Sequence, residues 1–286
     1  MATLIQPEAS NITAPTQFVA SRLETYAYRR FGRGSAPPLL GLQHFTGTLD
    51  FWDPAVTDPI ARGREVILFE NAGLGRSSGE VPDTMAGMAV HVLAFVDALG
   101  LIQVDVLGFS LGGVLAQLIA LDRPSLVRKM LLVGTAPEGG EDIMHLEKPE
   151  LKRILDDPNA QGLQRFVRLF FTPSESSQTA GQAYARRLAA RPQDREPVSG
   201  PNVTAAQLTA FRAGGRRGAF REAPPDPSAL PRRERRLRSD DFDPEFLCAS
   251  RAFAARHAAD LSGRRARFAV SVPRLVRATD VALSGF

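Results

Sequence analysis

The sequence is short of cysteine, of long apolar runs and of the aromatic residues tyrosine and tryptophan. Its 286 residues include a single cysteine, Cys248. One cysteine excludes an internal disulfide framework and a cysteine metal cluster. A chain without disulfides fits a reducing compartment, so we expect a cytoplasmic protein. No apolar run is long enough to cross a membrane, and we expect neither a membrane partner nor a bound metal.

The N-terminal residues lack the pattern of a secretory leader. Residues 1–16 are polar, contain Pro7 and Pro15, and have neither a basic start nor an apolar centre. We predict a loose arm over residues 1–16. The chain length suits one α/β domain with an inserted cap, or two small domains.

The distinctive stretch of the chain is residues 104–113, with the sequence VDVLGFSLGG. Its apolar start predicts a strand, residues 108–112 form a G-x-S-x-G motif, and residues 114–121 predict a helix. Such a strand–turn–helix is a nucleophile elbow, which places a serine, here Ser110, at the top of a sheet. Side chains two residues before or after Ser110 would collide with the neighbouring strand and helix, which explains the glycines. A glycine-rich loop in another doubly wound fold is the open alternative.

Further strands and helices flank this turn. We predict an edge strand at 24–29, strands at 39–43, 65–69 and 127–133, and a helix at 84–99 that Thr84 caps and Gly100 ends. This alternation favours a mostly parallel sheet with right-handed crossovers. The loop at 71–79 lacks a complete G-x-G-x-x-G, because Ser78 stands at the third glycine position, and we expect no dinucleotide cofactor.

The loop after the strand at 39–43 begins with His44 and is the predicted oxyanion loop. We predict that the backbone N–H groups of Thr46 and Leu111 form the oxyanion hole. His44 lies at a strand end ahead of the turn, a place that suits support of the loop better than proton transfer. His91, within the predicted helix at 84–99, is interpreted as structural.

The sequence pattern changes at Pro137, where the alternation of apolar strands and helices ends. Short amphipathic helices are predicted at 147–155, 163–171 and 180–190, separated by prolines, and together they predict a helical cap over residues 138–211. Three phenylalanines of the cap either line the substrate pocket or form plain core: Phe166, Phe170 and Phe171. Ser176 and Ser177 are predicted to be surface residues.

The runs 67–79, 108–113 and 132–136 resemble esterase-like bacterial members of the α/β-hydrolase fold-1 superfamily. The resemblance extends over residues 25–211. It implies an α/β-hydrolase fold with a core at 17–137, a helical cap, and a Ser-acid-His triad that needs no cofactor. Ser110 matches the nucleophile of this family. Epoxide hydrolases and haloalkane dehalogenases carry aspartate at that position, so their chemistries are disfavoured.

Residues 212–286 depart from that family. They hold 16 arginines, no lysine and 9 acidic residues, whereas residues 1–211 hold 19 basic and 22 acidic residues. The family pattern requires two more strands, an acid and a Gly-His, and we find none of these, so the C-terminal strands are predicted to be missing or disordered. His257 is the remaining choice of base, but its helix-like surroundings favour an exposed structural histidine.

Codon arithmetic suggests that this segment is read out of frame. Synonymous codons exist for residues 263–273 whose next frame reads Asp-Ala-Gly-His-Gly-Ser-Gln-Tyr-Pro, which resembles the catalytic-histidine turn of the family. Codons for residues 223–235 likewise allow a shifted reading that resembles the strand before the acid. The DNA sequence tests this hypothesis, because incompatible codons would exclude it.

Two functions therefore stay open. The first is a serine hydrolase that acts on a small ester or related acyl substrate through an acyl-enzyme at Ser110. The second is an impaired α/β-hydrolase remnant that keeps the pocket but lacks the acid and the base. A nucleic-acid arm at 212–286 is a third and weaker option, because that segment has no tyrosine, tryptophan or recognisable binding module.

Overall fold

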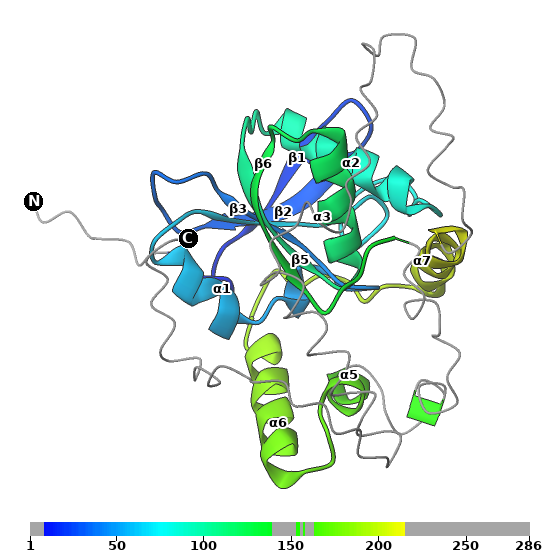
Figure 1. Ribbon diagram of the computed structural model, residues 1–286. Coiled ribbons are helices and arrows are strands. Elements are labelled where there is room, and N and C mark those ends of the chain that lie inside the picture. Colours follow the sequence, from blue (N-terminus) through cyan, green and yellow to red (C-terminus); the bar gives the residue numbers. More distant parts are fainter. Residues whose placement is uncertain (1–8, 139–152, 155–156, 158–162, 215–286) are drawn as a thin grey trace, which may run out of the picture. The chain divides into compact units, whose positions relative to one another are not determined.

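A computed structural model of the protein describes residues 9–138, 153–154, 157 and 163–214 (Figure 1). The strands are β1 (Thr16–Ala20), β2 (Thr25–Phe31), β3 (Leu39–Leu42), β4 (Val66–Phe69), β5 (Val104–Phe109) and β6 (Val127–Val133). They form one sheet in the order β1-β2-β4-β3-β5-β6. The neighbouring strands β4, β3, β5 and β6 are parallel to one another. β2 is antiparallel to both of its neighbours, β1 and β4. The prediction of a mostly parallel sheet is confirmed.

The helices are a 3-10 turn η1 (Leu49–Phe51), α1 (Pro54–Ala61), α2 (Met85–Ala98), α3 (Leu111–Asp122), α5 (Leu163–Phe170), α6 (Glu175–Ala189) and α7 (Pro201–Gly214). α2 begins as predicted, because the Thr84 side chain accepts a hydrogen bond from Gly87 N (3.0 Å) and caps the helix. Gly100, with φ of +64°, follows its end. No helix in the described ranges is both long and apolar enough to cross a membrane.

Both faces of the sheet are covered, because the side chains of its central strands alternate between two apolar clusters. In β3 and β4, Leu40 and Ile67 join the cluster that contains α2 and α3, whereas Leu39 and Leu68 join the cluster that contains Trp52 and α1. All four residues of each of these strands are buried. Continuous apolar strands of this kind are typical of a parallel sheet between two helical layers.

The structure corrects two predictions near the N-terminus. The strand predicted at 24–29 is β2, and the edge of the sheet is β1, which lies partly inside the predicted loose arm. Ala14 is fully buried, and Asn11 Nδ2 donates to the carbonyl of Trp52 (2.8 Å). Residues 9–16 are therefore fixed to the core, and residues 1–8 lie outside the described part of the chain.

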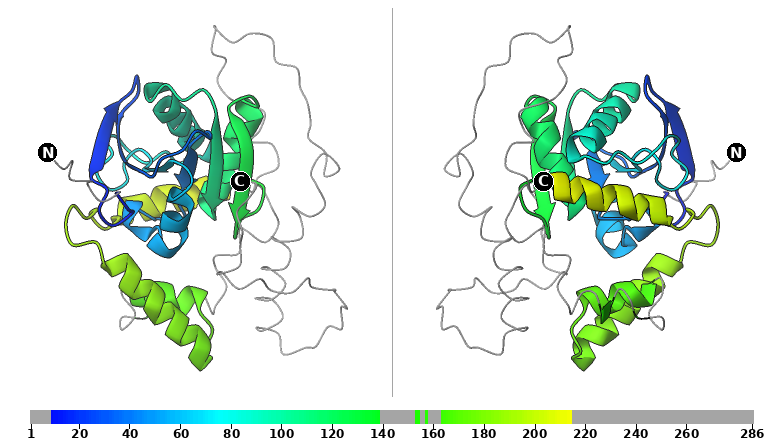
Figure 2. Two further views of the ribbon diagram at one scale, coloured as in Figure 1. Left: turned by 90° about the vertical axis from the view of Figure 1, so that its left-hand side faces the viewer. Right: turned by 90° about the vertical axis from the view of Figure 1, so that its right-hand side faces the viewer.

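The predicted cap divides into two parts in the structure. α5 and α6 pack on each other, while α7 lies against α2 and contributes Ala210 and Phe211 to the main apolar cluster (Figure 2). The C-terminal end of the segment predicted as cap, 138–211, therefore packs as core. The helix predicted at 147–155 lies mostly outside the described residues, and so does the segment predicted to lack strands, from residue 215 onward.

Candidate active site

Ser110 occupies a sharp turn between β5 and α3. Its φ is +53° and its ψ is −116°, a region that residues other than glycine rarely adopt. The turn is held by hydrogen bonds from Ser110 N to the Val133 carbonyl (2.8 Å) and from Thr135 Oγ1 to the Ser110 carbonyl (2.6 Å). The side chain of Ser110 is half-buried at the start of α3, where backbone N–H groups lack helical partners.

The glycines around Ser110 allow three backbones to come together. A Cβ atom on Gly112 would lie 2.0 Å from the Leu42 carbonyl oxygen, at the end of the neighbouring strand β3. A Cβ atom on Gly108 would lie 2.6 Å from Cα of Gly113 in α3. Both contacts are far shorter than van der Waals separation. The predicted collisions with the neighbouring strand and helix are therefore the reason for glycine here.

The end of β3 brings the predicted oxyanion loop to this turn. Thr46 in that loop has φ of +57°, an outlier for a β-branched residue. Its N–H donates to Oε1 of Gln207 in α7 (2.6 Å), and its carbonyl accepts from Ser199 Oγ (2.8 Å). The loop is thus held in place by the chain that returns from the cap.

A small cavity of about 20 Å³ lies between the loop, α3 and α7. That is room for about one water molecule. Leu111, His44, Gly47 and Gln207 are among the residues that line it. One cavity is therefore lined by residues of three parts of the chain. They are Leu111 at the start of α3, His44 and Gly47 before and after Thr46, and Gln207 of α7.

Comparison with known proteins agrees with this architecture. Residues 37–199 match the family model of the alpha/beta hydrolase fold. An alpha/beta hydrolase fold protein from Chitinophaga pinensis is 41% identical, with a TM-score of 0.67, over 72% of this chain and 74% of that one.

The chain belongs to the alpha/beta hydrolase fold family. Among curated relatives, RutD of Rhizobium rhizogenes, named as a candidate carbamate hydrolase, is 35% identical over 30% of this chain and 34% of its own. The triacylglycerol lipase of Burkholderia plantarii is 26% identical over 61% of this chain and 48% of its own. This alpha/beta hydrolase thus matches about a third to a half of the length of these two relatives.

His44 supports the loop of this alpha/beta hydrolase, as predicted, and is poorly suited to proton transfer. Its Nδ1 donates to the Phe45 carbonyl (2.7 Å), because a carbonyl only accepts, so Nε2 carries the lone pair. Nε2 is buried without a hydrogen-bond partner in the described structure. Burial lowers the pKa of His44 to about 4, and Phe51, Phe109 and Phe166 surround the ring.

Neither described histidine is placed as a base for Ser110. His91 Nδ1 forms a hydrogen bond with the Tyr26 hydroxyl (2.7 Å), on the core side of α2, which agrees with its structural interpretation. His257, which the sequence leaves as the remaining choice of base, lies outside the described residues. Within the described ranges, no group of three or more histidine, cysteine, aspartate and glutamate side chains is arranged to hold a metal ion.

An aromatic cluster joins the cap to the Ser110 turn. Phe166 and Phe170 of α5 have ring centroids 4.3 Å apart, and Phe170 lies 6.4 Å from Phe109, the residue before Ser110. Phe170 remains 40% exposed, so the cluster is open on one side. Phe171 instead lies against Tyr184 of α6, within the cap (ring centroids 5.9 Å). Of the three phenylalanines for which pocket lining and plain core were both open, Phe166 and Phe170 lie on the side of the cap that faces the turn.

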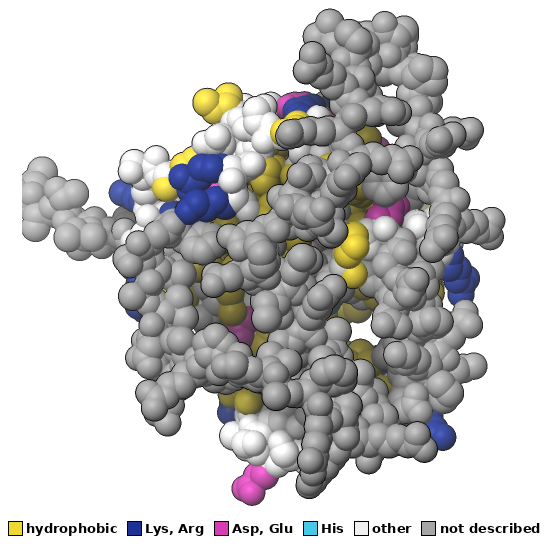
Figure 3. All heavy atoms as spheres, in the orientation of Figure 1, with side chains coloured by type: hydrophobic (Ala, Val, Ile, Leu, Met, Phe, Trp, Pro, Cys, Tyr) yellow, Lys and Arg dark blue, Asp and Glu magenta, His cyan; other side chains and the backbone are white. Residues whose placement is uncertain are grey.

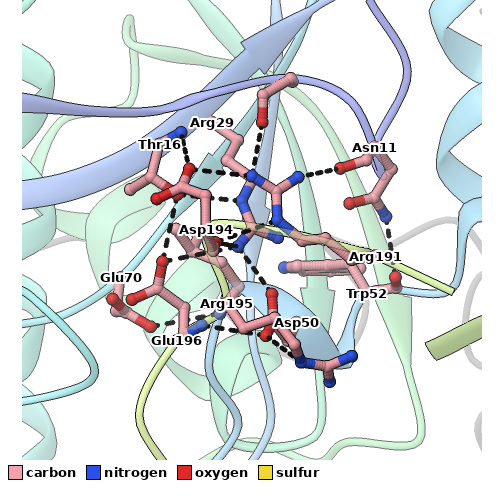
Figure 4. A network of polar contacts seen from close by, with 12 residues as sticks. Asn11, Thr16, Arg29, Asp50, Trp52, Glu70, Arg191, Asp194, Arg195 and Glu196 are labelled. Carbon is pink, nitrogen blue, oxygen red and sulfur yellow. Dashed lines mark hydrogen bonds and ion pairs between the residues drawn. The ribbon is translucent and has the colours of Figure 1, made fainter. Parts of the chain in front are cut away.

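A buried polar network joins the segment after α6 to the core (Figure 4). Arg29 of β2, which is 1% exposed, contacts Asp50 Oδ1 (2.6 Å) and Glu196 Oε1 (3.4 Å). Arg76 binds the same Glu196 and also Asp194. This network could not be predicted from the sequence, because its members are far apart in the chain and each resembles a solvated surface charge.

Glu70 places a second carboxyl group beside Glu196. It follows β4 and accepts hydrogen bonds from the backbone N–H groups of Leu49 (3.2 Å) and Arg76 (3.0 Å). Burial and the neighbouring Glu196 raise the pKa of Glu70 well above its usual range. Glu70 therefore keeps its proton to a higher pH than an exposed glutamate does.

Proposed function

We propose that this alpha/beta hydrolase is a serine hydrolase that acts on a small ester or related acyl substrate through an acyl-enzyme at Ser110. The observation that supports this most is the strained turn at Ser110, between β5 and α3, with φ of +53°. Such strain persists only where surrounding structure enforces it, and it clusters at functional sites. A strained turn at this place supports the nucleophile elbow expected from the sequence.

The chemistry follows from this position. Ser110 Oγ attacks the acyl carbonyl carbon, a histidine accepts the hydroxyl proton, and the carbonyl electron pair moves onto oxygen. The N–H groups of Thr46 and Leu111 hold that oxyanion until the leaving group departs with the proton. Water then releases the acyl group by the same steps. No cofactor takes part in this sequence.

The surroundings of Ser110 favour an apolar acyl or alcohol group. Phe109 and Phe170 lie within ring-contact distance on the cap side of the turn, and Phe166 extends the same aromatic surface. The similarity to a triacylglycerol lipase and to a candidate carbamate hydrolase keeps esters and carbamates within the substrate class. We therefore propose a small-molecule acyl substrate rather than a nucleic acid as the partner.

A catalytically impaired member of the family is the second candidate function. The observation that favours it is the state of the described histidines, since His44 is buried and His91 is bonded to Tyr26. In this account the fold and the elbow persist, but the acid and the base are missing. The protein with the sequence given, as opposed to one with a shifted C-terminal reading frame, would then bind acyl compounds and turn them over poorly.

Labelling with a fluorophosphonate tests the nucleophile. Where a base is present beside the turn, we expect the probe to form one adduct, on Ser110, and Ser110→Ala to abolish it. Ser177→Ala is the matched control, because this serine lies in α6 of the cap and should leave the labelling rate unchanged. Peptide mapping by mass spectrometry identifies the site. An adduct on another serine, with Ser110 unmodified, would contradict the proposal.

A further inference from the structure

Thr46 is held on both sides of its backbone by the chain that follows the cap. Its N–H donates to Gln207 Oε1 (2.6 Å), and its carbonyl accepts from Ser199 Oγ (2.8 Å). A residue with φ of +57° and a branched Cβ needs such support. Two independent contacts therefore set the direction of the N–H that we assign to the oxyanion hole.

The atom of Gln207 that faces this N–H is the carboxamide oxygen, because a backbone N–H only donates. The Gln207 side chain is 2% exposed, and the helix buries Val203, Gln207, Ala210 and Phe211 on one face. Gln207 also lines the small cavity together with Leu111, the other proposed donor. The Gln207 side chain thus accepts the hydrogen bond of the Thr46 N–H, which the carbonyl oxygen of an acyl substrate would need.

We infer that Gln207 is a gate of the acyl site. Its carboxamide oxygen satisfies the Thr46 N–H while the site is empty, and the carbonyl oxygen of an ester or related acyl substrate displaces it. Ser199 continues to hold the Thr46 carbonyl during this exchange, so the N–H keeps its direction. The inference rests on the proposed function of Ser110.

A gate of this kind competes with substrate before chemistry begins. The apparent affinity for the substrate equals the intrinsic affinity multiplied by the fraction of molecules whose Thr46 N–H is free. Gln207→Leu keeps the volume of the side chain and removes the oxygen. It should raise the rate constant for fluorophosphonate labelling of Ser110 by about two- to tenfold, a range that corresponds to one hydrogen bond. For p-nitrophenyl acetate, in the protein whose shifted reading frame after residue 212 supplies the base, KM should fall while kcat does not.

Gln207→Glu should change the rate constant for labelling of Ser110 in the opposite direction. It keeps the shape of the side chain and places a carboxylate where negative charge develops, so labelling should be slower than in the parent protein. Thr209→Ala is the matched control, because Thr209 is exposed on the same helix and donates to the Ala205 carbonyl (2.9 Å). Thr209→Ala should leave the labelling rate constant and the KM for p-nitrophenyl acetate unchanged.

Hydrogen exchange provides a readout that needs no chemistry at Ser110. The peptide that contains Thr46 should exchange faster in Gln207→Leu than in the parent protein. A merely structural Gln207 would make both Gln207→Leu and Gln207→Glu slower in labelling. Labelling of Gln207→Leu that is equal to or slower than the parent rate overturns the gate alone. No labelling of Ser110 in any of these proteins, made also with the shifted reading frame after residue 212 that supplies the base, overturns the proposed function and the gate with it.

Discussion

At the scale of single residues, Ser110 and Thr46 both adopt positive φ values at the carboxyl end of the sheet. Each such conformation costs about 1–3 kcal/mol and persists only where neighbouring groups enforce it. At Ser110 the support comes from Val133 and Thr135, and at Thr46 it comes from Gln207 and Ser199. Strain of this kind fixes the directions of a hydroxyl and an N–H in advance of any substrate.

His44 makes stability depend on pH in a defined direction. Burial lowers its pKa from 6.5 to about 4, so below pH 6.5 the unfolded chain binds a proton that the folded chain does not. The free energy of unfolding should therefore fall as pH decreases from about 6.5 to 4, by up to about 3 kcal/mol from this residue. Urea unfolding of the parent protein and of His44→Gln measures it.

The advantage of the parent protein over His44→Gln should be largest at neutral pH and should shrink toward pH 4. A difference between the two proteins that stays constant from pH 7 to pH 4 would show that His44 does not change protonation between the folded and unfolded states.

At the scale of elements, the return segment from residue 191 to α7 is joined to the core by buried charges. Arg29→Met removes a side chain that is 1% exposed and leaves the carboxylates of Asp50 and Glu196 buried with fewer partners. Removal of one member of a buried ion pair costs about 3–5 kcal/mol. Chemical unfolding should show a loss of this size.

The neighbouring residue on β2 provides the control for this prediction. Arg30 pairs with Glu65 on the surface, where the two side chains are 40% and 24% exposed. Arg30→Met should cost less than about 1 kcal/mol, because exposed ion pairs contribute little. Equal losses in Arg29→Met and Arg30→Met would contradict a stabilising role for the network.

The elements also show what the sequence could predict. Helical spacing, capping by Thr84 and the apolar runs of β3, β4 and β6 depend on neighbouring residues, so α2 and the parallel strands were predicted within a few residues. β1 was missed because its burial is set by pairing with β2. Gln207 was also missed, although a polar residue among Val203, Ala210 and Phe211 on the buried face of α7 was a visible signal.

At the scale of the whole molecule, the described charged side chains do not form one continuous patch on the face that Figure 3 shows. On the face shown in Figure 3, basic side chains lie at separate places beside acidic and apolar ones.

Among the described strands, β6 pairs only with β5, and Leu131 and Val133 on it are 41% and 42% exposed. Unpaired apolar edges promote association. We therefore expect the written chain to be poorly soluble, which light scattering measures.

The account requires a base that the described residues do not supply to Ser110. Serine is a weak nucleophile until an adjacent base takes its proton. In a serine protease, loss of the histidine alone costs about a millionfold in kcat. The shifted reading of residues 263–273 would supply a Gly-His turn. We therefore expect the chain as written to hydrolyse activated esters weakly or not at all.

Hydrolysis of p-nitrophenyl esters tests this central claim most directly. Two proteins are compared, the chain as written and a chain expressed from a gene whose reading frame is shifted after residue 212, each with Ser110→Ala as control. The frame-shifted protein should be at least about a thousandfold more active, and Ser110→Ala should abolish that activity. Turnover of ordinary enzyme size in the written chain, abolished by His257→Ala, would contradict the account.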